Sequence, residues 1–127
     1  FENKIKFKTS DINKEISCKL NKTLFAWVIE NIIKNSIDAM KGQGNIIIDI
    51  QKEKKYIFVN IIDSGPGLEK GVNGKIFEPG YTTKKRGWGL GLSLAKRIIE
   101  DYHKGKLQIK NNKITTGLHI CVILKSL

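Results

Sequence analysis

Three polar side chains recur on one face of a segment that otherwise has the pattern of a buried helix. Asn31, Asn35 and Asp38 are spaced by four and then three residues, so a helix stacks them one turn apart. Buried amides and carboxylates without partners are strongly destabilising. This face therefore either forms a polar network in the core or binds a ligand, and a hydrated metal ion with phosphates is a candidate.

A second candidate group follows the apolar run at residues 56–62, where Asp63 precedes a turn that contains Gly65 and Gly67. An acid at the end of a buried strand, followed by glycines, is a common way to present a carboxylate in a cleft. Taken alone, the sequence Asp-Ser-Gly-Pro-Gly is equally typical of an ordinary turn.

A glycine-rich stretch then runs directly into an amphipathic pattern. Gly87, Gly89 and Gly91 precede it, and unpaired backbone N–H groups at such a helix start attract an anion. The stretch is neither the G-x-x-x-x-G-K-[ST] phosphate loop nor a dinucleotide-binding fingerprint.

Together the four segments 30–40, 63–67, 76–85 and 87–93 resemble the N, G1, F and G2 boxes of the Bergerat-fold (GHKL) ATPases, in the family's order. More narrowly, they resemble the ATP-binding catalytic domain of sensor histidine kinases. The resemblance covers roughly residues 20–100, and four ordered motifs are far more specific than any single glycine loop.

The resemblance implies ATP and Mg²⁺ as cofactors. It makes Asn35 the magnesium ligand, places Asn31 near a metal-bound water or a phosphate, and directs Asp63 at the adenine amine, which a hydrogen-bond acceptor selects over the carbonyl of guanine. The remaining nucleotide-binding candidates are Asp38, Gly65, Gly67, Ile76, Thr82, Thr83, Lys84, Arg86, Gly87, Gly89, Leu90, Gly91, Leu92 and Thr116.

The reaction is predicted from one position. Hydrolytic relatives carry Glu one turn before the magnesium Asn, whereas this chain has Asn31, and an amide is no general base. The resemblance therefore implies transfer of the γ-phosphoryl group to a histidine, with Asn31, Asn35 and Lys84 as the catalytic residues. The alternatives are a hydrolytic GHKL ATPase that drives dimer closure and a non-catalytic ATP-binding regulatory module.

The implied partners are a histidine-bearing dimerisation domain of the same protein, a response regulator receiver domain and a second copy in a homodimer. Neither His103 nor His119 lies in an acceptor-like motif, so both are expected to be structural or surface residues. Because the chain begins with Phe1, we expect residues 1–127 to be a single catalytic domain cut from a longer protein, with the acceptor domain absent.

Composition fits one ordinary globular domain. The net charge is +11, yet the lysines are dispersed without an aromatic-basic pattern, so nucleic acid is not an expected partner. No apolar run is long enough to cross a bilayer, so any membrane contact is expected only through parts not present here. Two isolated cysteines suit a reduced, cytoplasmic setting.

The elements that must position these residues form an α+β pattern. The sequence predicts a two-layer α/β sandwich, the Bergerat fold, whose mixed, mainly antiparallel sheet is covered on one face by about three helices. Asn21 is the predicted N-cap of the first long helix, which should end near Gly42. Strands are predicted at 4–8, 15–19, 45–51, 56–62, 106–110 and 118–124, and helices also at 72–77 and 90–102. In the last helix, Leu92, Leu94, Ala95, Ile98 and Ile99 are predicted to face inward.

Overall fold

A five-stranded mixed sheet forms one layer of the protein. The computed structural model describes residues 4–9, 16–67, 75–78, 91–110 and 117–127. The strands lie in the order β1-β2-β3-β5-β4, with bounds β1 Lys4–Thr9, β2 Gln43–Glu53, β3 Tyr56–Asp63, β4 Lys106–Lys110 and β5 His119–Lys125. Only β1 pairs parallel to its neighbour, β2, and the other pairs are antiparallel.

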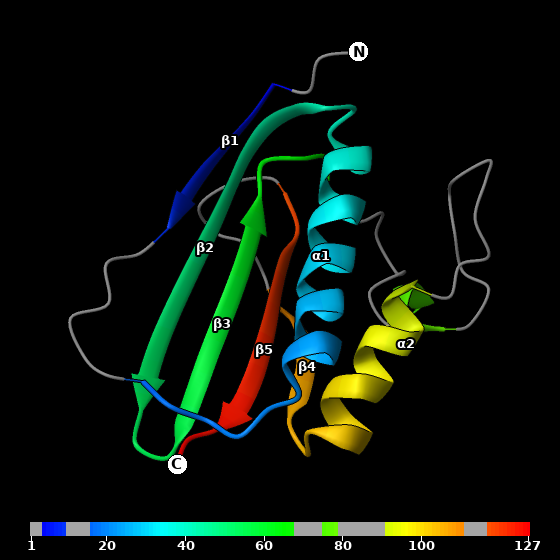
Figure 1. Ribbon diagram of the computed structural model, residues 1–127. Coiled ribbons are helices and arrows are strands. Elements are labelled where there is room, and N and C mark those ends of the chain that lie inside the picture. The colour runs from blue at the N-terminus through cyan, green and yellow to red at the C-terminus, as the bar shows by residue number, and fades with distance from the viewer. Residues whose placement is uncertain (1–3, 10–15, 68–74, 79–90, 111–116) are drawn as a thin grey trace.

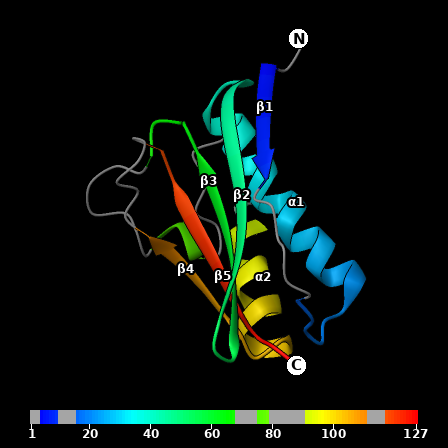
Figure 2. The ribbon, with the colours of Figure 1, turned by 90° about the vertical axis from the view of Figure 1, so that its left-hand side faces the viewer.

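The second layer consists of helices on one face of this sheet (Figures 1 and 2). Helix α1 spans Lys22–Ala39, the short 3₁₀ helix η1 spans Lys75–Phe77, and α2 spans Gly91–Arg97. The chain continues from α2 into a π-helix, η2, at Ile98–Tyr102. The predicted α+β class and two-layer arrangement are therefore confirmed.

Alternation along the strands determines which side chains reach the helices. Val59 and Ile61 of β3 form one core cluster with Val28 and Ile32 of α1 and with Ile99 of η2. Residues between them in β3, such as Asn60, belong to the opposite face of the sheet. The core thus lies between the sheet and the helices.

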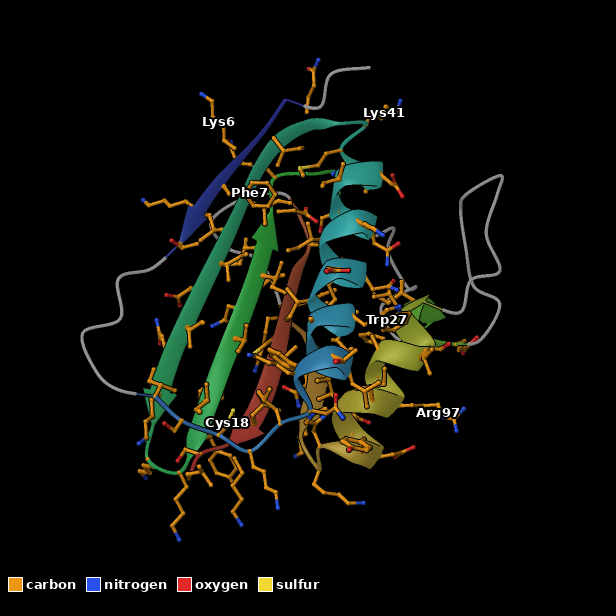
Figure 3. All side chains as sticks on the ribbon, viewed as in Figure 1. Lys6, Phe7, Cys18, Trp27, Lys41 and Arg97 are labelled. Carbon is orange, nitrogen blue, oxygen red and sulfur yellow. The ribbon has the colours of Figure 1, made fainter. Side chains whose placement is uncertain are left out.

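Both ends of α1 are closed by local hydrogen bonds. The Asn21 side chain accepts from the Leu24 N–H at 3.0 Å, which confirms the predicted N-cap. At the other end Lys41 N–H donates to the Asp38 carbonyl and Gly42 N–H to the Ile37 carbonyl. This is a Schellman arrangement, with the left-handed turn on Lys41 (φ 55°) as well as on Gly42 (φ 78°). Figure 3 shows Lys41 at this end of the helix.

Two predictions about packing were wrong. The segment predicted as a strand at 15–19 makes only an isolated bridge between Cys18 and Ser126 in its described part, because it crosses the end of the sheet to reach α1. Leu94 is 42% exposed rather than buried. Ala95 and Ile99, four residues apart, already define the inner face of the helix, and Leu94 lies about 100° away from Ala95.

The other predicted elements are present. The hairpin turn falls at Lys54, whose φ is 55°, and of the predicted helix at 72–77 the structure describes Lys75–Phe77 as one 3₁₀ turn. The last helix begins at Gly91 among the described residues and reaches Tyr102 as predicted, although its final turn is π-helical. No described helix is both long enough and apolar enough to span a membrane.

Candidate functional site

Of the three polar residues predicted to share one face of α1, the two asparagines contact each other. Asn31 and Asn35 are both partly buried, and Asn35 Nδ2 donates to Asn31 Oδ1 at 3.4 Å. This contact uses the nitrogen side of the Asn35 amide, so its oxygen faces the other way. Asp38 lies on the same helix but is exposed. The structure therefore brings the two asparagines together and places Asp38 towards solvent.

The carboxylate of Asp63 lies at the carboxyl end of β3 and is only 3% exposed. Its Oδ1 accepts two backbone hydrogen bonds, from Gly65 N–H at 3.0 Å and from Leu118 N–H at 2.9 Å. The Asp63 N–H in turn donates to the Leu118 carbonyl at 3.0 Å. These two N–H donors orient the carboxylate.

Two glycines allow this close packing around Asp63. A Cβ at Gly117 would overlap the Asp63 carbonyl oxygen and would lie 2.5 Å from Asp63 Oδ1. A Cβ at Gly65 would lie 3.0 Å from Met40 Cγ and 3.2 Å from Asp63 Oδ1. Gly67 has a separate reason to be glycine, because its φ is 72°.

The turn after β3 is fastened to the end of α1 and the start of β2. Ser64 Oγ accepts from the Asn45 N–H at 2.9 Å, and Ser64 N–H donates to the Asn45 carbonyl at 3.0 Å. The buried Met40 lies beneath, with its sulfur 3.5 Å from Ser64 Oγ. The residue after Asp63 is thus bonded to the start of β2 and contacts the residue that caps α1.

The start of α2 lies directly against the asparagine pair. A Cβ at Gly91 would overlap Asn31 Oδ1, so only glycine allows this approach without moving the amide. The end of the glycine-rich stretch therefore meets α1 beside Asn31. Leu92, the next residue, is partly buried against the core, and Ile76 in η1 is buried.

Several predicted nucleotide contacts lie outside the described residues. They are the phosphate and lid candidates and the candidate on the last connection: Thr82, Thr83, Lys84, Arg86, Gly87, Gly89, Leu90 and Thr116. Their roles stay predictions.

Conversely, the structure adds Gly117 and Leu118 to the site. Sequence spacing gave no signal for these two residues, because their partner Asp63 is more than fifty positions away.

The residues fit a magnesium ion held mainly by oxygen. Among the described residues no three His, Cys, Asp or Glu side chains gather as a metal site. The amide oxygen of Asn35, turned away from Asn31 by the hydrogen bond above, is the kind of hard ligand that Mg²⁺ takes when phosphates and water supply the rest.

Both histidine rings bond residues other than Asp63, although His119 pairs in the sheet with its neighbour Ile62. His119 Nε2 lies 2.8 Å from Asn60 Oδ1, and burial and the nearby Lys110 charge lower the pKa of its imidazole, against an opposing effect of Asp49. His103 accepts a hydrogen bond from the Asn21 N–H, at the far end of α1.

Both cysteines are free thiols, and burial raises the pKa of Cys18 and of Cys121.

Comparison with known proteins places this arrangement in a family. The family described as "Histidine kinase-, DNA gyrase B-, and HSP90-like ATPase" matches residues 21–126. Sporulation kinase E of Bacillus subtilis is 36% identical over 87 residues, which cover 68% of this chain and 12% of that protein. Nitrogen regulation protein NtrY of Azorhizobium caulinodans is 27% identical over 124 residues, covering 92% and 16%. The chain thus spans under a fifth of these two relatives.

Solved structures agree with the sequence comparison. The catalytic domain of histidine kinase ThkA superposes with a TM-score of 0.79 at 30% identity, and the match covers 96% of this chain and 79% of that one. A structure of ThkA in complex with the response regulator TrrA matches with a TM-score of 0.76 at 28% identity, covering 97% and 34%. The fold and motifs are those of histidine kinase catalytic domains. The chain therefore belongs to the histidine kinase-, DNA gyrase B- and HSP90-like ATPase family.

Proposed function

We propose that this chain binds Mg-ATP and donates the γ-phosphoryl group to a histidine on a separate dimerisation domain, as part of two-component signal transduction. The observation that carries the proposal is the amide of Asn31, which lies beside Asn35, the proposed magnesium ligand, and against the start of α2. The family membership and the kinase relatives support it.

Recognition of the base rests on Asp63. Backbone N–H groups hold Oδ1, so the carboxylate cannot rotate, and an ionised carboxylate only accepts hydrogen bonds. Such a group favours the exocyclic amine of adenine and disfavours the carbonyl of guanine. Gly65 would let the backbone pass close to the base, and the neighbouring Met40 would supply apolar surface.

We assign the phosphates and the metal to Asn31 and Asn35 of α1 and to the start of α2. Asn35 would hold the magnesium ion through its amide oxygen, and Asn31 orients that amide by accepting from its nitrogen. Bound Mg²⁺ supplies neutralisation of the charge on the phosphate oxygens. Lys84 adds a positive charge in our proposal, and the rest of the rate comes from positioning.

Slow hydrolysis follows from Asn31. Water attack is accelerated by a general base, typically by a factor on the order of 10²–10⁴, and an amide cannot accept the proton. Glu30 is exposed and lies about 100° around the helix, so it does not replace that base. The domain therefore retains ATP for a phosphoacceptor instead of transferring the group to water.

This reaction needs a histidine acceptor and a protein that takes the phosphoryl group from it. Neither histidine of the chain lies at the site, so the acceptor is assigned to a dimerisation domain of the same protein, which forms a homodimer. A response regulator would take the phosphoryl group next. The neighbour ThkA was solved with the response regulator TrrA, which supports this assignment.

In the test, this chain is joined to a helical dimerisation domain that bears an acceptor histidine. Radiolabelled ATP is then added to the joined protein. We expect an acid-labile, base-stable phosphohistidine, and we expect loss of that signal in Asn35→Ala, whose helix remains favourable because Ala is a good helix former. ADP binding without metal should change much less than transfer does. Wild-type transfer by Asn35→Ala would remove the magnesium assignment.

The isolated chain provides the second arm of this test. We expect ATP hydrolysis barely above background, and Asn31→Glu is the variant that recreates the hydrolytic arrangement. Steady turnover at about one per second or faster by the wild-type chain would favour the hydrolytic GHKL alternative, since removal of a general base slows such reactions by orders of magnitude. Complete lack of ATP affinity would favour a non-catalytic module.

Gly91→Ala is expected to reduce phosphotransfer about tenfold or more with little loss of stability. The added methyl would overlap Asn31 Oδ1, which is the end of a rotatable side chain and can move, so the fold survives while the amide leaves its place. Transfer assays and urea unfolding measure the two effects. Because the clash needs the Asn31 side chain, Gly91→Ala should add almost no loss in an Asn31→Ala background. Additive losses would contradict this account.

A further inference from the structure

The backbone of the residue that caps α1 is bound by the residue that ends the second helix. Asn21 N–H donates to His103 Nε2 at 3.0 Å, across 82 positions of sequence. On its other side the same ring places Nδ1 at 2.9 Å from the Ile98 carbonyl oxygen. His103 therefore connects the first turn of α1 to the last turn of the helix that begins at Gly91.

These contacts determine the tautomer of the ring. A backbone N–H can only donate, so Nε2 must be an acceptor and carry no proton. The proton of the neutral imidazole then resides on Nδ1, which donates to the Ile98 carbonyl. A doubly protonated ring would place an N–H against the Asn21 N–H and could not form this connection.

The π-helical turn brings the ring to this place. His103 N–H donates to the Ile98 carbonyl at 3.1 Å, five residues back, and the same carbonyl receives the ring proton. The wider turn shifts His103 around the axis relative to an α-helical continuation, and the ring edge packs against Phe25 and Tyr102. Local π-turns of this kind are frequent at functional sites.

The two helices run antiparallel, so they meet at two levels (Figure 1). Asn21 and His103 join them at the start of α1. Ten residues further along α1, Asn31 lies against Gly91 at the start of α2. The rise of a helix separates these levels by about 15 Å. A change of spacing at the first level tilts α1 against α2 and alters the contact between Asn31 and Gly91.

We propose that His103 is a positioning residue for the nucleotide site: it fixes the spacing of α1 and α2 at which Asn31 and Gly91 meet. The proposal rests on the function assigned above, because its effect on nucleotide acts through Asn31. His103 itself touches no reacting group in this account. Its loss should weaken Mg-ADP binding roughly three- to tenfold, the size typical of coupling through packed elements.

The test uses the unusual fact that the partner of the ring is a backbone N–H. Asn21→Pro removes that donor, and the φ of −83° at this position is close to the proline range. Asn21→Ala removes the side-chain cap but keeps the N–H, so it is the matched control. We expect His103→Ala to weaken Mg-ADP binding in the wild-type and Asn21→Ala backgrounds and to have no further effect in the Asn21→Pro background.

A general loss of stability needs its own control. Cys121→Ala opens a small cavity in β5, on the sheet face opposite the helices, where Cys121 is 1% exposed. At a temperature where all variants are folded, Cys121→Ala should bind Mg-ADP like wild type, although it is less stable. Unchanged affinity in His103→Ala, or equal loss in all three Asn21 backgrounds, would overturn the positioning role.

A spectroscopic readout separates this inference from the proposed function. Nitrogen-15 NMR of the imidazole should show His103 as the Nδ1-protonated tautomer in the wild-type chain and a change towards the usual mixture in Asn21→Pro. If the chain binds no nucleotide but His103 has this tautomer, the proposed function fails and the connection stands. If the ring is Nε2-protonated, the connection itself is wrong.

Discussion

Asp63→Asn is expected to lower ATP affinity by about tenfold to a hundredfold, which corresponds to the loss of a hydrogen bond to a charged group. The carboxylate is buried and held by Gly65 N–H and Leu118 N–H through Oδ1. An asparagine can keep those two bonds through its oxygen, but it then presents an NH₂ group where the adenine amine needs an acceptor. Two donors would face each other.

Titration with a fluorescent ATP analogue measures this effect, and guanine specificity provides a second readout. Asp49→Asn is the matched control, because Asp49 lies on the neighbouring strand β2, on the opposite face, where it bonds Gln51 at 2.9 Å. Asp49→Asn should bind ATP like wild type. Equal affinity in wild type and Asp63→Asn would remove Asp63 from the adenine site.

Gly117→Ala is expected to have the other large effect, because it should reduce both the stability and the ATP affinity of the folded protein. The new methyl would overlap the Asp63 backbone carbonyl, which cannot rotate away as a side chain end can. Overpacking of this kind typically destabilises by about 1–3 kcal/mol. To relieve this overlap, β3 and the start of β5 must separate. That movement also takes Asp63 Oδ1 away from the Leu118 N–H.

Gly105→Ala offers a strict comparison. A Cβ at Gly105 would also overlap a backbone carbonyl, that of Ile123 on β5, but near the opposite end of the strand. We expect a similar fall in the urea midpoint for both variants. Only Gly117→Ala should then lose nucleotide affinity under conditions where the protein is still folded. Loss of affinity in both variants would indicate a general effect of destabilisation.

The elements were predictable where their signals are local. The N-cap at Asn21 and the two strands on either side of Lys54 depend on residues within a few positions, and these elements were predicted. The strand predicted at 15–19 and the burial of Leu94 failed for a different reason. Alternation and helical periodicity describe a pattern along the chain, but the path across the end of the sheet and the exact face of a helix depend on tertiary packing.

The site was predictable as motifs but not as contacts. Asn31, Asn35 and Asp63 could be named because their residue types and spacing match a known order of motifs. The bonds from Leu118 to Asp63 and from Asn21 to His103 span 55 and 82 positions, and no spacing rule connects such residues. Their partners became evident only when the strand order β3-β5-β4 and the antiparallel helices were known.

The strand order has a consequence for folding kinetics. The last strand of the chain, β5, lies inside the sheet between β3 and β4. The β2–β3 hairpin is local, and isolated hairpins form in roughly 1–10 μs, whereas the pairing of β3 with β5 must close a long loop first. Until that happens Leu118 cannot hold Asp63, and β4 has no strand to pair with. Nucleotide binding is therefore a late event in folding, and during synthesis it must wait for the final residues of the domain.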